Sequence, residues 1–503
     1  MKLKKWLSLS ALVAFVITGC AVAPATPALS ADVAPELQSF YSQSLNWTKC
    51  GDLKCATIKV PLDWNKPSAG SIKLALNYLP STGSADKGWL VENPGGPGGS
   101  GLDFVKGGGE QVGSADVKAH YNIVGFDPRG VMSSSKVVCL NAKQTDTFLY
   151  EPTPGAIGST TELNATKAAY KNFAAACAKN TGALLGHVDT VSAARDMDII
   201  RALLGETKLN YLGFSYGTFL GTTYATLYPK NVGRFVLDGA IDPTVSDEDS
   251  SAYQLKAFDT ALHNYLKNCL EVTPSLCPFT GSVDNAMTKI TAFFKTLETK
   301  SIKTSLSGRK LTLSGGITGL IMTLYSNDYW RYTSSAFKSA FAGDGTLFLQ
   351  LADFYNDRNA NGTYASNMLE ANMAVNCLDG RSNPSTAAMN AQNARLLQLS
   401  PFFGRYWRNG ALGCAYWPYP LATRPTSYAA AGSGPIIVVG TTGDPATPYW
   451  EAQNLANKIL DNGHLITYNG EGHTAYGRSN SCVVTAVDGY LLNGIVPAKD
   501  PNC

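Results

Sequence analysis

Short, continuously apolar segments recur along the chain, and glycine-rich turns and helix-like stretches separate them. Runs of this kind are typical of strands that are buried on both faces of a parallel sheet, whereas residues 190–204 have the apolar spacing of a helix. The candidate strands are residues 56–61, 71–79, 88–92, 121–126, 209–214, 234–237, 435–439 and 464–468. This alternation predicts an α/β fold with a mostly parallel central sheet flanked by helices.

The pattern changes between Asp242 and about Glu370. Aromatic-rich segments with helical spacing, such as 252–270 and 283–297, replace the strands. We therefore predict a large helical lid over 242–370, inserted after the sixth core strand. The core then comprises residues 36–241 and 371–503, which suits a chain longer than one typical domain.

The amino terminus has the pattern of an export signal. Three lysines, at positions 2, 4 and 5, precede an apolar run over residues 6–17 that is too short to span a bilayer as a mature helix. We predict a signal peptide over residues 1–19. The protein is then exported, to the outer face of the cell membrane or into the medium.

The run ends in I-T-G-C, and a small residue before Cys20 resembles the processing site of a bacterial lipoprotein. Ordinary signal cleavage elsewhere, with an incidental Cys20, is the alternative. We predict that Cys20 carries lipid and is the contact with the membrane. The Pro/Ala-rich residues 20–35 would then be a disordered tether.

The cysteine count agrees with export. The chain has eleven cysteines, so a lipidated Cys20 leaves an even number, as expected for disulfides in an exported protein. Close spacing suggests two disulfides, Cys50–Cys55 and Cys269–Cys277. The other six cysteines allow several connectivities, and pairing each with its neighbour in sequence gives the other three disulfides. The predicted pairs are Cys50–Cys55, Cys269–Cys277, Cys139–Cys177, Cys377–Cys414 and Cys482–Cys503.

Composition is that of a globular enzyme, with 45% apolar and 16% charged residues. Without the three lysines of the signal peptide, 38 basic and 38 acidic residues remain. Such a neutral body offers no electrostatic footprint for nucleic acid. The sequence contains no C-x-x-C pair or His/Cys cluster that suggests a metal, and we expect no cofactor. It gives no indication of oligomeric state.

A candidate nucleophile lies in the segment G-F-S-Y-G, residues 213–217, between a predicted strand and a predicted helix. A serine on so sharp a turn leaves no room for Cβ atoms two residues to either side, which is why the elbow requires glycines. The motif alone is a weak signal, but its position predicts acyl-bond cleavage through Ser215.

A glycine-rich loop, N-P-G-G-P-G-G-S-G at residues 93–101, follows another predicted strand. An amide at Gly95 or Gly96 can join that of Tyr216 in binding the oxyanion of a tetrahedral intermediate, and the position of the loop favours Gly96. A plain Gly/Pro turn is one alternative. A dinucleotide loop is another, but the spacing lacks G-x-G-x-x-G.

The acid and the base are predicted from chain order. Asp444 lies in G-D-P-A-T-P just beyond a predicted strand, and Thr447 is placed to support its carboxylate. Of the five histidines, only His464 and His473 follow Asp444, as this fold requires. His464 opens a strand, at the wrong end of the sheet. His473, in G-E-G-H-T, is therefore the predicted base.

Together these motifs resemble the secreted tripeptidyl aminopeptidases of actinobacteria, α/β-hydrolase serine peptidases related to prolyl iminopeptidase. The matching stretches also include G-F-D-P-R-G at 125–130, V-L-D-G at 236–239 and A-V-N-C-L-D at 374–379. The iminopeptidases carry His before G-G-P-G, whereas this chain has Pro94, which favours the tripeptidyl branch. The resemblance implies an α/β-hydrolase fold and the release of tripeptides from the free amino terminus of peptide substrates.

Such an exopeptidase needs a group that recognises the substrate's α-ammonium, and a carboxylate at the return from lid to core is the natural candidate. Asp379 is the first candidate, Glu370 the second and Glu92 a distant third. Arg129, in D-P-R-G, is interpreted as a structural ion-pair partner.

Two other functions are compatible with the motifs. A carboxylesterase or lipase would use the same Ser215, Asp444 and His473. A lipid-anchored binding protein on a hydrolase scaffold would need a broken set of catalytic residues, and no expected member of that set is missing from the sequence.

Overall fold

A nine-stranded sheet organises the computed structural model, which describes residues 33–503. The strands lie in the order β1-β2-β3-β5-β4-β6-β7-β10-β11. Their bounds are β1 Thr48–Cys50, β2 Leu53–Pro61, β3 Ser71–Leu79, β4 Trp89–Asn93, β5 Asn122–Phe126, β6 Leu209–Phe214, β7 Val232–Asp238, β10 Ile436–Gly443 and β11 Gly463–Glu471. In this sheet order, every neighbouring pair from β5 to β11 is parallel. The pairs β1–β2, β2–β3 and β3–β5 are antiparallel. The prediction of a mostly parallel sheet is confirmed.

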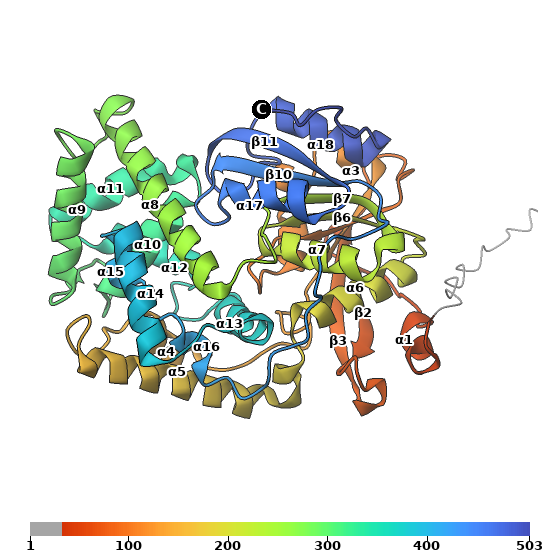
Figure 1. The fold of residues 1–503 in the computed structure, drawn as a ribbon, viewed down its shortest axis with the longest axis horizontal. Coiled ribbons are helices and arrows are strands. Elements are labelled where there is room, and N and C mark those ends of the chain that lie inside the picture. Colours follow the sequence, from red (N-terminus) through yellow and green to blue (C-terminus); the bar gives the residue numbers. More distant parts are fainter. Residues whose placement is uncertain (1–32) are drawn as a thin grey trace, which may run out of the picture.

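Helices cover both faces of this sheet (Figure 1). On one face α2 (Gly101–Gly107), α3 (Ala115–His120) and α18 (Ser481–Asn493) pack over an apolar layer that includes Leu212 and Ile437. On the other face lie α6 (Thr190–Leu203), α7 (Tyr216–Leu227) and α17 (Tyr449–Asn454). The sheet is therefore buried on both sides, as its continuously apolar strands require.

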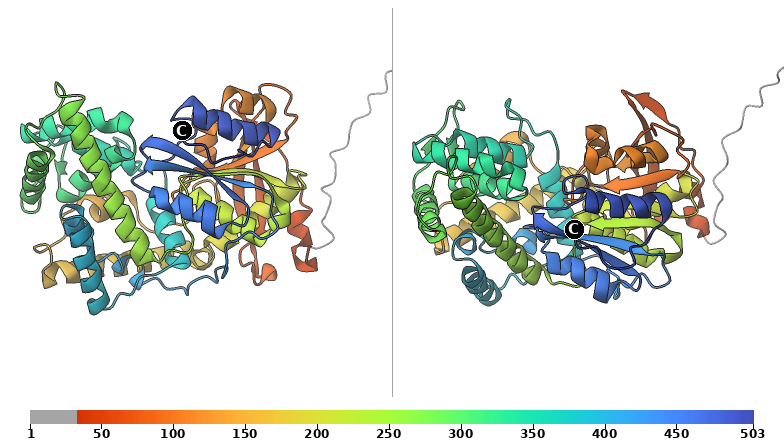
Figure 2. Two further views of the ribbon diagram at one scale, coloured as in Figure 1. Left: turned by 45° about the horizontal axis from the view of Figure 1, so that its top comes forward. Right: turned by 90° about the horizontal axis from the view of Figure 1, so that it is seen from above.

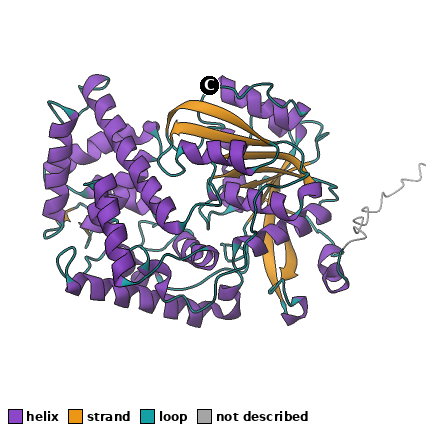
Figure 3. Ribbon diagram, in the orientation of Figure 1, coloured by secondary structure: helices purple, strands orange, loops and turns teal. Residues whose placement is uncertain are grey.

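A mainly helical part lies beside the sheet rather than on it, as Figures 2 and 3 show. Its helices are α8 Asp247–Glu271, α9 Val283–Leu297, α10 Leu313–Leu324, α11 Trp330–Phe341 and α12 Thr346–Tyr355, with a small hairpin of β8 Ile302–Lys303 and β9 Lys310–Leu311. These elements enclose an apolar cluster of their own. They follow β7, the strand predicted over 234–237.

Helical packing does not stop at residue 370. After α13 (Met368–Asp379) come α14 Thr386–Leu399, α15 Phe403–Tyr406 and α16 Leu412–Ala415, and the sheet resumes only at β10. Phe402 and Phe403 pack in the same cluster as the lid helices, whereas Val375 and Leu378 of α13 pack in the core beneath the sheet. The lid boundaries, 242–370, stay a prediction.

Three helices complete the fold. They are α1 Gln38–Tyr41, α4 Ala142–Tyr150 and α5 Thr160–Thr181. Tyr150, at the end of α4, joins the lid cluster, so this part of the chain contacts both halves of the molecule.

The five predicted disulfides are confirmed. The bonded pairs are Cys50–Cys55, Cys139–Cys177, Cys269–Cys277, Cys377–Cys414 and Cys482–Cys503. The predicted signal peptide, Cys20 and most of the tether lie outside the described residues. No described helix has the length and apolar character needed to cross a membrane.

Candidate active site

Ser215 occupies a strained turn between β6 and α7. Its backbone has φ 55° and ψ −124°, a region that non-glycine residues rarely adopt. A Cβ at Gly213 would lie 2.5 Å from the carbonyl oxygen of Gly217, and one at Gly217 would lie 2.6 Å from that of Asn93. The two glycines are therefore required by close backbone packing, as the sequence predicts for a nucleophile elbow.

The glycine-rich loop packs directly on this elbow. A Cβ added at Gly95 would lie 2.9 Å from Cβ of Ser215 and 3.0 Å from the amide nitrogen of Tyr216. The amide of Gly95 donates to Asn93 Oδ1 at 2.9 Å, whereas within residues 33–503 the amides of Gly96 and Tyr216 have no hydrogen-bond acceptor. Gly96 is also exposed where Gly95 is buried. These two free amides have the character of an oxyanion hole.

Asp444 and His473 form a hydrogen-bonded pair. His473 Nδ1 lies 2.9 Å from both carboxylate oxygens of Asp444, and the carboxylate also accepts from the amides of Ala446, Thr447 and Thr474. Burial alone would raise the pKa of Asp444, but the charge of His473 and these hydrogen bonds lower the pKa below its ordinary value. Asp444 is thus held as a carboxylate that fixes the imidazole.

Thr447 supports this pair. Its hydroxyl donates to Asp444 Oδ2 at 3.0 Å and lies 3.3 Å from His473 Nδ1. The hydroxyl therefore holds the carboxylate on the side that faces the imidazole ring. This agrees with the supporting role predicted from the position of Thr447 in G-D-P-A-T.

Asp238 links the serine to the histidine loop. Its carbonyl oxygen accepts from the amide of Ser215 at 2.9 Å, and its buried carboxylate accepts from the amides of Ala475 and Tyr476 at 2.7 to 3.0 Å. The next residue, Gly239, would place a Cβ 3.1 Å from His473 Cε1. The V-L-D-G motif had no predicted role, and an acid at the end of a buried strand is the signal that could have indicated one.

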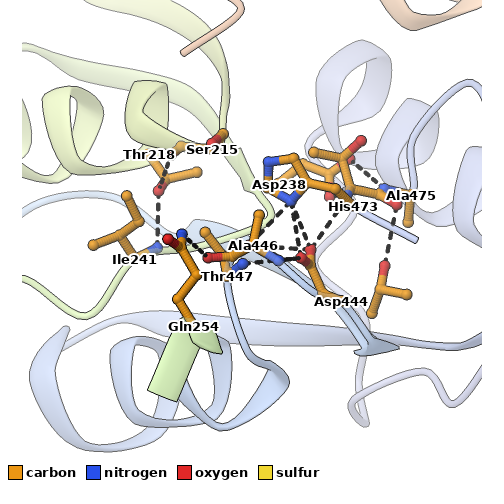
Figure 4. A network of polar contacts seen from close by, with 12 residues as sticks. Ser215, Thr218, Asp238, Ile241, Gln254, Asp444, Ala446, Thr447, His473 and Ala475 are labelled. Atoms are coloured by element: carbon orange, nitrogen blue, oxygen red, sulfur yellow. Dashed lines mark hydrogen bonds and ion pairs between the residues drawn. The ribbon is translucent and has the colours of Figure 1, made fainter. Parts of the chain in front are cut away.

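Figure 4 shows the His473 ring between Asp444 and the elbow that carries Ser215. Within the described part of the chain, the hydroxyl of Ser215 makes no hydrogen bond, to His473 or to any other group. Hydrogen bonds of catalytic groups are often long without substrate and tighten in the complex. The assignment of Ser215, Asp444 and His473 as a triad therefore stays a prediction, one with which the Asp444–His473 pair agrees.

The lid contributes a contact that sequence reasoning missed. The amide of His473 donates to the carbonyl oxygen of Tyr325, directly after α10, at 2.7 Å. The Tyr325 ring packs edge-on to the imidazole, with centroids 5.7 Å apart. The lid is therefore bonded to the loop of the predicted base. No local motif marks Tyr325, because the contact joins residues 148 positions apart.

The two first candidates for binding the substrate's α-ammonium lie at opposite ends of α13. Asp379 is buried, and its two oxygens accept from the amide and the hydroxyl of Thr190 at 2.9 and 2.5 Å. Burial raises the pKa of Asp379 to about 7. The Thr190 hydroxyl also lies 2.5 Å from that of Tyr216, so Asp379 contacts the elbow through Thr190.

Glu370 lies in the first turn of α13 and accepts from the amides of Cys139 and Leu140. Glu92, the third candidate, is 0% exposed on β4 and has no hydrogen-bond partner among the described residues. It alternates with Val91 along β4 and so shares the strand face of Leu90, which packs in the apolar layer under α2, α3 and α18.

Arg129 has the structural role expected of it. It is fully buried and forms a two-pronged ion pair with Asp196, with both N–O distances 2.7 Å. Over residues 33–503, no group of three His, Cys, Asp or Glu side chains is arranged to hold a metal ion.

Comparison with known proteins identifies two family models in this chain. The model described as "alpha/beta hydrolase fold" matches residues 88–273, and the one described as "TAP-like protein" matches residues 400–503. The first covers the glycine-rich loop and the elbow; the second covers the segment that carries Asp444 and His473.

Curated relatives match nearly the whole chain. Serine protease Hip1 of Mycobacterium tuberculosis is 34% identical over 99% of this chain and 97% of its own length. Tripeptidyl aminopeptidase of Streptomyces lividans is 32% identical over 91% of this chain and 85% of its own. Carboxylesterase B of Mycobacterium tuberculosis is 38% identical over 90% and 86%.

Proposed function

Because the chain belongs to the α/β-hydrolase serine peptidases that include the tripeptidyl aminopeptidases, we propose that it releases tripeptides from the free amino terminus of peptides. One combination of features supports the proposal: an elbow serine, a hydrogen-bonded carboxylate–imidazole pair, and two amides that have no acceptor within residues 33–503. This combination serves acyl transfer to a serine.

In the proposed reaction, Ser215 attacks the third carbonyl carbon of the substrate while His473 Nε2 accepts the hydroxyl proton. Asp444, held ionised, keeps Nδ1 protonated and stabilises the imidazolium. The amides of Gly96 and Tyr216 donate to the oxyanion of the tetrahedral intermediate. His473 then protonates the departing amine, and water hydrolyses the acyl-enzyme by the same steps.

Selection of a free amino terminus requires a carboxylate at a fixed distance from the serine. Asp379 and Glu370 are the candidates, and both lie on α13, whose middle packs beside the glycine-rich loop: Asn372 Nδ2 donates to the carbonyl oxygen of Pro97 at 3.1 Å. A charge-assisted bond to the α-ammonium favours unblocked peptides.

The site of action follows from the amino-terminal sequence. Cleavage before Cys20 and lipidation of that residue would anchor the enzyme to the outer face of the cell membrane. The five disulfides support an oxidising compartment. Globomycin treatment of producing cells, with mass spectrometry of the amino terminus, tests the anchor.

A carboxylesterase is the second candidate, because one relative at 38% identity carries that name. Free and N-acetylated tripeptide p-nitroanilides separate the two functions. The aminopeptidase hydrolyses only the free form, whereas an esterase prefers p-nitrophenyl acyl esters to both.

The proposal is tested with a panel of free di-, tri- and tetrapeptide reporters and with Ser215→Ala. We expect the tripeptides to be hydrolysed fastest and the variant to lose more than about 10⁴-fold in kcat. Ser335→Ala, at an exposed lid serine, is the matched control and should match the parent enzyme. Retained turnover in Ser215→Ala, or labelling of that variant by a fluorophosphonate, would show that another group is the nucleophile.

A further inference from the structure

A cavity of about 430 Å³ lies at the junction of the core and the lid. It is bounded by the start of α13, the segment after β5, α4 and the end of α12. Residues on its wall include Met132, Leu140, Leu149, Tyr355, Glu370 and Asn372. Its volume is within the range of about 300–1,000 Å³ that is usual for small-ligand sites.

The cavity borders the glycine-rich loop. Asn372, on its wall, donates to the carbonyl oxygen of Pro97. A Cβ at Gly98 would lie 3.0 Å from the carbonyl oxygen of Met368, another wall residue. Glu370 therefore lies within one turn of α13 of Met368 and Asn372, the two residues that contact this loop.

The cavity also approaches the predicted base. Tyr355, on the wall, lies 5.9 Å ring to ring from Tyr325, whose ring in turn packs on His473. Wall residues of the cavity thus contact the glycine-rich loop on one side, and Tyr355 contacts Tyr325, the tyrosine beside the imidazole, on the other. Figure 1 shows α13 between the sheet and the lid helices, which is where a substrate covered by the lid would lie.

Glu370 is the acidic group on this wall, and one of its oxygens is available. Oε1 accepts from the amides of Leu140 and Cys139 at 2.7 and 3.0 Å, whereas Oε2 accepts from no residue that the structure describes. Lys136 also borders the cavity but forms no ion pair with Glu370 within residues 33–503. The side chain is thus fixed by one oxygen and leaves the other for a ligand cation.

Asp379 differs on each of these points. Both of its oxygens accept hydrogen bonds from Thr190, and it does not border the cavity. Its connection through Thr190 to Tyr216 suits a residue that positions the elbow.

We propose that this cavity holds the amino-terminal part of the substrate, with the α-ammonium bound by Glu370 Oε2, and that Asp379 positions Tyr216 instead. This inference rests on the proposed function, and it selects Glu370 rather than Asp379 as the carboxylate that binds the α-ammonium. Three extended residues span about 10 Å, so the cavity sets the product length by the distance from Glu370 to Ser215. Its Met, Leu and Tyr wall selects apolar side chains at the first residue.

Glu370→Gln tests the assignment, because the amide keeps Oε1 as the acceptor for Cys139 and Leu140 and removes only the charge. We expect kcat/KM for a free tripeptide reporter to fall about 10–100-fold, mainly through KM, as for a lost charge-assisted bond. The N-acetylated reporter should be hydrolysed as slowly as by the parent. The rate of fluorophosphonate labelling, which needs no amino terminus, should be unchanged.

Asp379→Asn is the comparison variant. It should keep the parent's ratio of free to acetylated turnover, whatever its effect on kcat. Leu149→Trp gives an independent measurement, since it enlarges the α4 wall of the cavity and leaves residue 370 unaltered: KM for free tripeptides should rise at least about 10-fold, again with unchanged labelling.

The outcomes separate the two proposals. A parent enzyme that does not discriminate between free and acetylated reporters contradicts the aminopeptidase function itself. A parent that discriminates, together with a Glu370→Gln variant that discriminates equally well, overturns the role of Glu370. If Glu370→Gln does not fold, Leu149→Trp decides: an unchanged KM excludes the cavity as the substrate site.

Discussion

The Thr447 hydroxyl donates a hydrogen bond to the carboxylate of the Asp444–His473 pair. In Thr447→Val, Asp444 Oδ2 loses the hydroxyl donor, while its contacts with His473 Nδ1 and the amide of Thr474 remain. We expect kcat for tripeptide reporters to fall about 10–100-fold, the effect of losing a hydrogen bond of about 1.5–3 kcal/mol to a charged group. KM should change little, because Thr447 does not contact the proposed substrate cavity.

Thr447→Ser is the matched control, since it keeps the hydroxyl. It should retain most of the parent activity. A loss in Thr447→Ser as large as that in Thr447→Val would contradict the role of the hydroxyl, because the serine variant keeps the hydroxyl and lacks only the methyl group.

The raised pKa of Asp379 predicts how the stability of the folded protein changes with pH. Burial raises its folded-state pKa from the ordinary 3.8 to about 7, so the folded protein holds the proton more tightly than the unfolded chain does. The stability that this group contributes is complete below pH 3.8 and is lost as the pH rises to about 7. Asparagine imitates the protonated form at every pH. The Tm of Asp379→Asn relative to the parent should therefore be higher at pH 8 than at pH 5.

Differential scanning calorimetry at the two pH values measures this change. Asp52→Asn, at an exposed position, is the control and should show no such trend. A Tm difference for Asp379→Asn that is constant or falls with pH would mean that the aspartate is already ionised in the folded protein at pH 5.

Local rules in the sequence mark the three residues that we predict to form the triad. Ser215 is marked by flanking glycines, Asp444 by a turn after a buried strand, and His473 by chain order. Asp238 and Tyr325 carry no such mark, because their roles come from contacts with Ser215, Ala475 and His473 that only the folded chain creates. The candidates for binding the substrate's α-ammonium, Asp379 and Glu370, stay predictions, because the partners of an acid, such as Thr190 for Asp379, cannot be read from its neighbours in sequence.

Strand β4 carries a buried residue, Glu92, that we expect to lower the stability of the fold. Glu92 is fully buried and has no hydrogen-bond partner among residues 33–503, and burial raises its pKa well above the ordinary value. An unpaired buried polar group costs stability. We expect Glu92→Met, of similar size, to raise the free energy of unfolding by about 1–3 kcal/mol. Urea denaturation measures it.

Glu206 is the matched control for this change, because its carboxylate accepts from the amide of Trp89 on the same strand. Glu206→Met should lower the free energy of unfolding, since it leaves that amide unpaired. If Glu92→Met were destabilising, Glu92 would have a partner, such as a bound water, that stabilises it.

Eight of the nine strands of the sheet were predicted, because a short apolar run indicates a buried strand without information from the rest of the chain. Strand β1 was missed, because it has three residues and is mostly exposed. The lid boundaries, in contrast, depend on contacts between distant segments. The lid cluster joins Tyr150, residues of α8 to α12, and Phe402, and no periodicity within one segment shows which distant segment completes its core. Helix α13 illustrates the limit, because it follows the lid in sequence but packs on the sheet.

The disulfides give a prediction for the molecule as a whole. Cys377–Cys414 closes a loop with a sequence separation of 37, and Cys50–Cys55 one of 5. Loop entropy predicts a stabilisation of about 4 kcal/mol for the first and about 2 kcal/mol for the second. Replacing Cys377 and Cys414 by serine should therefore lower Tm more than replacing Cys50 and Cys55. The opposite order would show that strain or residual structure outweighs loop entropy.

The bond from the His473 amide to the Tyr325 carbonyl has a practical meaning for protein engineers. Trimming the helical insertion to obtain a minimal hydrolase is a natural simplification, but it would remove the acceptor of the His473 amide and so loosen the loop that carries the predicted base. A shortened enzyme would need a replacement carbonyl grafted at that spot, so the cover and the chemistry have to be redesigned together.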